Sequence, residues 1–178
     1  TFHLLCREDI HFSGQLKKAL ASADEVYFEM DLDDPSNTLG GLLFINMRKG
    51  LTLSDLYSEA DYRRLETFFK DSLGRSLSGM KRMKPSVIEA VLYPKLMPCS
   101  SLSGIDMELL NLAQQAKKEV KGFETIAEQG AVFDSIPYET QAKGLLNTID
   151  SFNIYRNMFD SLLVVYKNQQ MNEIEKMM

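Results

Sequence analysis

The sequence predicts an α/β fold that is rich in helices and contains a small, partly parallel sheet. Residues 1–6 read as the end of a strand, residues 13–23 have the spacing of a short helix, and residues 25–31 form a second strand. A strand, a helix and a second strand are typical of a βαβ unit, in which the two strands run parallel. A chain of 178 residues is long enough to bury one core, so we expect a single domain.

The apolar pattern divides this single domain, residues 1–178, into three segments. Residues 1–35 contain the βαβ start, and residues 36–100 are predicted to be mostly helical and to form a cap over the sheet. In residues 101–178 a helix, the short strand "EVKGFE" and another helix precede long C-terminal helices. The last helical pattern stops without a cap residue, which predicts that the chain is part of a longer domain.

Charge, hydropathy and cysteine usage limit the classes of partner. The net charge of −5 and the lack of a basic stripe argue against a nucleic-acid partner. The longest apolar stretches are too short for a transmembrane segment. Cys6 and Cys99 lack the spacing of a zinc or redox motif, which leaves two interpretations open: a disulfide in an exported protein, or two unpaired buried thiols. The oligomeric state is not indicated.

Glu29 is the first candidate functional residue, because it lies inside an otherwise apolar strand. A carboxylate buried in such a strand is costly unless it is paired or coordinates an ion. Side chains alternate along a strand, so Glu29 shares a face with Tyr27 and lies on the opposite face from Phe28. Glu29 therefore need not point into the main apolar layer, and we expect it to face a crevice.

Three polar residues are predicted at the carboxyl ends of strands, where the binding groups of a parallel sheet gather: His3, Glu29 and Glu124. One imidazole and two carboxylates suit Zn, Mn, Fe or Co, and one carboxylate can instead act as a general base toward water. Simpler interpretations stay open. Arg7 is a candidate partner for Glu29, Glu124 suits a helix N-terminus, and a lone histidine is commonly a structural hydrogen bonder.

Four stretches of the sequence, read together, resemble one protein family. They are "TFHLLCRED", "ADEVYFEMDLDDP", "MKPSVIEAVL" and residues 104–141. The last stretch carries eight residues in the order expected for the family: Gly104, Asp106, Ala113, Gly122, Glu124, Thr125, Glu128 and Gln129. In these stretches the chain is similar to the TraB/GumN family, which is related to the Tiki metalloproteases and more distantly to the erythromycin-esterase and ChaN-like proteins.

The resemblance implies an α/β fold with a metal-dependent hydrolytic site. Carried over to this sequence, His3 and Glu29 are expected to bind a divalent metal ion (Mn, Co or Zn), and Glu29 and Glu124 are the expected catalytic carboxylates. Further candidates for the same crevice are Asp31, Asp106 and Gln129. The resemblance also implies a second G-x-x-H motif after the long C-terminal helices, and these 178 residues do not contain it.

The predicted function is therefore a metal-dependent hydrolase, most simply a peptidase that acts on exported or surface proteins. The alternative is a non-catalytic protein that captures a peptide or a small molecule in the same crevice. A second histidine motif in the full-length protein would favour the enzyme, and its absence would favour the binding protein. The resemblance also favours an exported protein of a bacterium, in the periplasm or the cell envelope.

Overall fold

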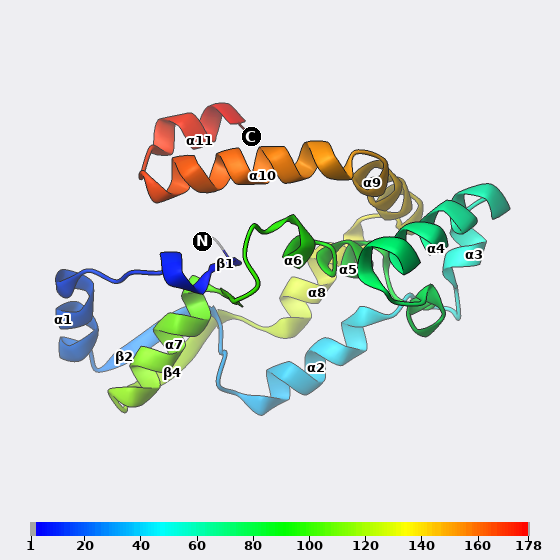
Figure 1. Ribbon diagram of the computed structural model, residues 1–178. Coiled ribbons are helices and arrows are strands. Elements are labelled where there is room, and N and C mark those ends of the chain that lie inside the picture. Colours follow the sequence, from blue (N-terminus) through cyan, green and yellow to red (C-terminus); the bar gives the residue numbers. More distant parts are fainter. Residues whose placement is uncertain (1–2, 178) are drawn as a thin grey trace.

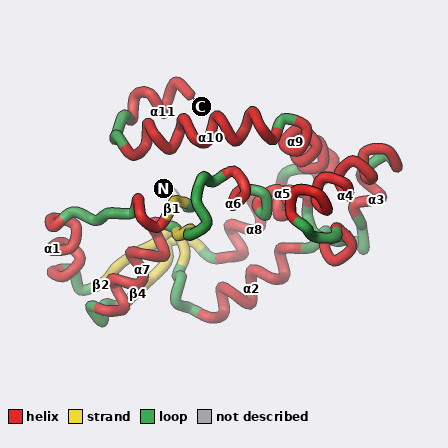
Figure 2. The backbone as a smooth tube through the Cα atoms, in the orientation of Figure 1, coloured by secondary structure: helices red, strands yellow, loops and turns green. Residues whose placement is uncertain are grey.

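The computed structural model describes residues 3–177, and it confirms the predicted helix-rich α/β class (Figure 1). Helices dominate the described chain, and the strands form two small sheets (Figure 2). The strands are β1 (Leu5–Cys6), β2 (Glu25–Met30), β3 (Leu102–Ser103) and β4 (Glu119–Glu124). The helices are α1 (Gly14–Ser22), α2 (Pro35–Ile45), α3 (Leu53–Leu56), α4 (Glu59–Leu73), α5 (Pro85–Ala90), α6 (Tyr93–Leu96), α7 (Ile105–Gln115), α8 (Ile126–Ser135), α9 (Tyr138–Asp150), α10 (Phe152–Lys167) and α11 (Met171–Met177), with the short 3-10 turns η1 (Arg7–Asp9) and η2 (Leu77–Met80).

The pairing of the strands corrects the interpretation of residues 1–35 as a βαβ unit. β2 pairs in parallel with β4, with Glu25 opposite Glu119 and Met30 opposite Glu124. β1 belongs to a separate antiparallel pair with β3. The parallel strands are therefore β2 and β4, which lie far apart in the sequence. The order of elements along the chain indicates that two parallel strands are joined by a crossover connection, but it does not identify the strand that pairs with β2.

Helix α7 covers one face of the parallel sheet. Phe28 of β2 and Val120 of β4 pack against Leu110 and Ala113 of α7. Gly122 lets the two strands come close where β2 ends, since a Cβ built on it would lie 2.2 Å from the backbone nitrogen of the residue after β2. The face opposite α7 carries Tyr27 and Glu29, as the alternation of side chains predicts.

The main apolar core lies among the helices, which changes the expected role of residues 36–100. Leu65 of α4, Ile88 of α5 and Leu145 of α9 are fully buried there. The predicted cap helices thus bury their apolar faces against the C-terminal helices, and Figure 1 shows them beside the parallel sheet rather than over it. Helix α4 ends at Gly74, which has the left-handed backbone conformation that glycine adopts without strain.

Cys6 and Cys99 form a disulfide, which decides between the two interpretations left open by the sequence. Their Cα atoms are 5.9 Å apart and the bond joins positions separated by 93 residues. It ties β1 to the loop that follows α6. A second, smaller core surrounds this bond and includes Leu5, Met97 and Leu163 of α10. Of the helices in the described part of the chain, none is both long and apolar enough to cross a membrane.

Candidate functional site

Glu29 and Glu124 come together at the carboxyl ends of β2 and β4, as the sequence predicts for functional residues of a parallel sheet. The side-chain amide nitrogen of Gln129 donates a hydrogen bond to each of them. The distance from Gln129 Nε2 to Glu124 Oε2 is 2.6 Å, and the second bond reaches Glu29 Oε1. Both carboxylates are exposed to solvent. One contact group therefore contains three of the predicted crevice residues. We call Glu29 and Glu124 the carboxylate pair, and the side-chain amide of Gln129 the bridging amide.

The start of α8 explains how Gln129 reaches both strands. Thr125 follows β4 directly and caps α8, because its hydroxyl oxygen accepts a hydrogen bond from the backbone N–H of Glu128. The Glu128 carboxylate in turn accepts bonds from the backbone N–H and the hydroxyl of Thr125, and these bonds lower the pKa of Glu128. This reciprocal capping box makes a tight turn, so the first turn of α8 returns toward the strand end.

Helix α8 is held in place by α2 through close contacts at glycine. A Cβ built on Gly130 would lie 2.3 Å from the ring of Phe44, and one built on Gly40 would lie 2.9 Å from the side chain of Ile126. At the other end of α8, Asp134 forms ion pairs with Lys84 and Arg48. The helix that carries the bridging amide is therefore fixed at both ends.

His3 forms a second contact group with Asp106. Its Nδ1 lies 2.9 Å from Asp106 Oδ2, in the first turn of α7. Gly104 permits this approach, because a Cβ there would lie 2.6 Å from the carbonyl oxygen of His3. The structure thus places two of the predicted residues, His3 and Asp106, against one another rather than against the carboxylate pair.

The described side chains do not complete the predicted metal site. Within residues 3–177, no three His, Cys, Asp or Glu side chains form a group that could hold a metal ion. The ring nitrogen Nδ1 of His3 is engaged by Asp106, and the oxygens of Glu29 and Glu124 converge on an amide. In this arrangement His3 contacts Asp106 and belongs to a different group from Glu29 and Glu124, so we derive no chemical step through a metal ion.

Asp31 takes part in a different arrangement, just after β2. Its backbone oxygen accepts a hydrogen bond of 2.7 Å from the side chain of Asn37. The neighbouring Asp31 carboxyl group raises the pKa of Asp33. Asp34 caps α2 by accepting from the N–H of Ser36. The acidic loop thus serves mainly to turn the chain from β2 into α2.

The structure excludes the simplest explanation of Glu29, which was an ion pair with Arg7. Arg7 pairs instead with Glu108, at 3.3 Å. Among residues 3–177, neither Glu29 nor Glu124 has a lysine, arginine or histidine partner. The carboxylate pair therefore has no basic neighbour among the described residues.

Sequence reasoning missed an aromatic pair beside these carboxylates. The rings of Tyr27 and Phe123 stack with their centroids 5.1 Å apart, on the sheet face that α7 does not cover. Lys121 lies over the Tyr27 ring and pairs with Glu25. The signal was present in the alternation of β4, which places Lys121 and Phe123 on one face, but a single exposed aromatic residue is not informative by itself.

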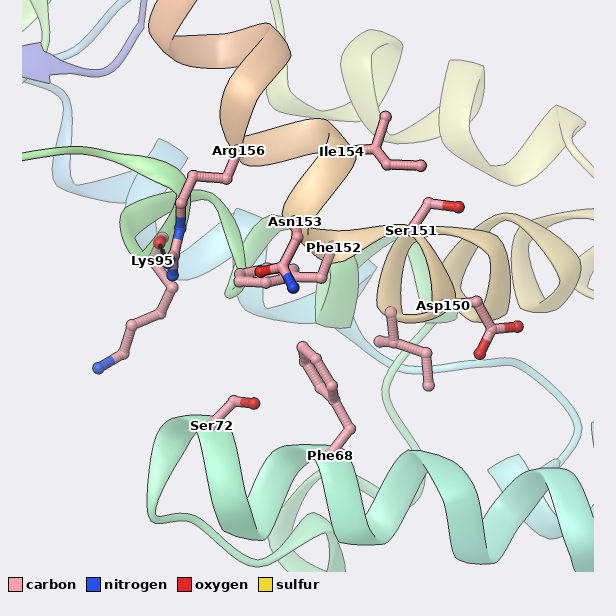
Figure 3. A pocket seen from close by; sticks show the side chains of 10 residues that line it. Phe68, Ser72, Lys95, Asp150, Ser151, Phe152, Asn153, Ile154 and Arg156 are labelled. Carbon is pink, nitrogen blue, oxygen red and sulfur yellow. Dashed lines mark hydrogen bonds between the residues drawn. The ribbon is translucent and has the colours of Figure 1, made fainter.

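Two hollows of the described chain lie elsewhere, and none of the predicted site residues lines them. Figure 3 shows one of about 380 Å³ between α4 and the junction of α9 with α10, with Phe68, Asp150 and Arg156 in its walls. The other, of about 590 Å³, lies between the η1 region and the end of α10 and is lined in part by His11 and Tyr166. Glu29, Glu124 and Gln129 lie together at the strand ends and not in these hollows.

Comparison with known proteins matches this chain to one family. The model of the TraB/PrgY/gumN family matches residues 1–178. Searches among curated proteins and among solved structures gave no match. Each of the eight motif residues has a structural role. The two glycines allow close backbone approaches, Thr125 and Glu128 form the capping box, and Ala113 packs against the sheet. The other three, Asp106, Glu124 and Gln129, belong to the two contact groups. With its whole length matched, this chain belongs to the TraB/PrgY/gumN family.

Proposed function

We propose that this protein is a peptidase-like hydrolase in which Glu29 and Glu124 are the reacting carboxylates. One observation carries the proposal: oxygens of both residues converge on the amide of Gln129, at the carboxyl ends of two parallel strands. Ligands of open α/β sheets bind at this end. Two carboxylates without basic neighbours are an arrangement suited to proton transfer and not to a structural ion pair.

The chemistry follows from the two groups and the amide between them. One carboxylate accepts a proton from the water that attacks the scissile carbonyl, and the other, in its protonated form, donates a proton to the leaving amine. General acid–base catalysis of this kind contributes about 10² to 10⁴ in rate. Gln129 acts as a positioning residue, because its amide donates a hydrogen bond to an oxygen of each carboxyl group and holds the two groups together.

The family resemblance also implies a divalent metal ion (Mn, Co or Zn), with His3 and Glu29 as the candidate ligands. Calorimetric titration of Mn²⁺, Co²⁺ and Zn²⁺ into the protein tests it. Saturable binding that is lost in both Glu29→Gln and His3→Ala would support a metal site at the strand ends. Binding that is equal in both variants and the parent protein would place any ion elsewhere.

The hydrolase itself is tested with a mixture of unstructured peptides, whose products are identified by mass spectrometry. We expect cleavage to fall by at least about 100-fold in Glu29→Gln and in Glu124→Gln, since each loses one proton-transfer group. Glu139→Gln removes an exposed charge from α9 and serves as the matched control. Full activity in both site variants would refute the proposal.

A non-catalytic binding protein is the second candidate, and the exposed aromatic pair favours it. Tyr27 and Phe123 offer a contact surface next to the carboxylates that proton transfer does not need. A binding protein would retain its ligand in the presence of a chelator and return it chemically unchanged. Export to an oxidising compartment is the accompanying proposal, supported by the Cys6–Cys99 disulfide.

A further inference from the structure

The outer face of the parallel sheet, defined here by Tyr27, Glu29, Lys121 and Phe123, lacks a cover in the described chain. Helix α7 packs on the inner face only. On the outer face Tyr27 is 46% exposed and Phe123 is 77% exposed, although their rings stack on one another. Two aromatic rings held together in solvent form a flat apolar platform, which is a surface suited to a partner.

The two strands also have open edges. Within the described residues β2 and β4 hydrogen-bond to one another and to no other strand, so the outer edge of each strand keeps unpaired N–H and C=O groups. An open edge of this kind accepts an extended peptide as an additional strand, with main-chain hydrogen bonds that do not depend on sequence. The neighbouring face then contacts every second side chain of that peptide.

Charge decides which peptide fits. Lys121 is already engaged by Glu25 and by Glu119, the latter at 3.4 Å. The carboxylates of Glu29 and Glu124, at the other end of the strands, have no basic partner among residues 3–177. The region therefore holds four carboxylates against one ammonium group. A second copy of this chain, with a net charge of −5, would bring more negative charge, whereas a cationic partner is complementary.

Apolar side chains continue the surface beyond the carboxylate pair. Val132 and Phe133 follow Gln129 by three and four positions, so they lie on the same side of α8. Both are exposed. A peptide that places a basic residue at the carboxylate pair thus meets apolar surface on both sides, the aromatic pair along the sheet and the α8 side chains ahead.

We propose that the outer face and open edge of the β2–β4 sheet bind an extended peptide in which a lysine or arginine is flanked by apolar residues. The basic side chain lies at Glu29 and Glu124, and the apolar side chain two positions away in the peptide lies on Tyr27 and Phe123. This inference rests on the proposed function, since it names the substrate class of the same carboxylates.

The test measures binding of three synthetic peptides to the whole chain by calorimetry. The first is acetyl-LFKLFA-amide, and in the other two the lysine is replaced by alanine or by glutamate. We expect the lysine peptide to bind at least about fivefold more tightly than the alanine peptide, because an exposed ion pair contributes roughly 1 kcal/mol, which corresponds to that ratio of affinities. The glutamate peptide is expected to bind more weakly than either, and the preference should decline as NaCl is raised.

Two variants and two matched controls locate the site. Glu29→Gln should remove most of the preference for the lysine peptide. Phe123→Ser should lower the binding affinity for all three peptides by about fivefold, because the aromatic contact is lost. The controls change the same kinds of group elsewhere: Glu139→Gln on α9 and Ile154→Ser on α10, where Ile154 is also exposed. Unchanged binding in both controls supports the assignment, and circular dichroism confirms that each variant is folded.

Mass spectrometry of the same samples separates this inference from the proposed function. A lysine preference that depends on Glu29, without any cleavage, supports the inference and refutes the hydrolase. Cleavage of all three peptides at equal rates and with equal affinity overturns the inference and leaves the hydrolase standing. Equal binding of the three peptides, or binding unaffected by Phe123→Ser, likewise overturns it. Concentration-dependent dimerisation that Phe123→Ser abolishes would show that a second copy covers this face, and would also overturn it.

Discussion

The ion pair between Lys84 and Asp134 yields the sharpest stability prediction, because it fixes the helix that carries the bridging amide. Lys84 precedes α5 and is only 1% exposed, and Asp134 in α8 is 12% exposed. The ammonium group faces Asp134 Oδ1 as an ion pair without well-directed hydrogen-bond geometry. The only other cationic partner of Asp134 among the described residues is Arg48, whose side chain is 70% exposed.

The change Asp134→Asn preserves the volume of the side chain and removes its charge. It leaves the ammonium of Lys84 buried without a carboxylate, facing only a neutral amide at position 134 and the ring of Phe44 5.8 Å away. Removal of one partner from a buried pair costs about 3 to 5 kcal/mol. Arg48→Gln removes only the exposed partner and should cost less than about 1 kcal/mol. We expect the two changes to differ in their effect on the free energy of unfolding because Lys84 is buried, whereas Arg48 is exposed.

Urea unfolding at neutral pH, followed by circular dichroism, measures both changes. With a slope of roughly 2 kcal/mol per molar urea, a loss of about 4 kcal/mol moves the midpoint by about 2 M. The double variant Lys84→Met with Asp134→Leu should recover most of this loss, because an apolar pair of similar size needs no compensation for burial. If Asp134→Asn costs no more than Arg48→Gln, the ammonium of Lys84 reaches water and the reasoning is refuted.

Three further outcomes follow from the structure. Reduction of the disulfide should lower the free energy of unfolding by roughly 4 kcal/mol, close to the chain entropy of a loop closed across 93 residues, and an unchanged thermal midpoint in reducing agent would contradict this. Gly122→Ala should cost about 1 to 3 kcal/mol in urea unfolding by overpacking the strand contact, whereas Gly79→Ala, where a Cβ meets no atom within 4 Å, should not. Thr125→Ala should destabilise the protein by about 1 kcal/mol at neutral pH through loss of the helix cap. Because the pKa of Glu128 is lowered from 4.5 in the folded protein, its contribution is present above that value and is lost as the pH falls through the lower folded pKa, so parent and Thr125→Ala stabilities should converge in acid.

Local rules explain which parts of the site could be predicted. Alternation along β2 placed Glu29 opposite the buried Phe28, and the structure confirms it. The strand "EVKGFE" and the helix after it were predicted from the apolar pattern, and the structure confirms them as β4 and α8, although the capping box of Thr125 and Glu128 was not predicted. The meeting of Glu29 with Glu124 was foreseen from the general behaviour of parallel strands, although their shared contact with Gln129 was not.

The sequence by itself determined the helix-rich character of the chain, the strands β2 and β4, the face of β2 on which Glu29 lies and the residue types near the strand ends. These follow from backbone periodicity and capping, which act over a few residues. Tertiary structure alone decided that β2 pairs with β4, that His3 turns to Asp106 across 103 positions, and that Cys6 bonds to Cys99. Those contacts depend on which apolar faces bury one another, such as α7 on the parallel sheet and α4 with α9, and distant parts of the chain make that choice together.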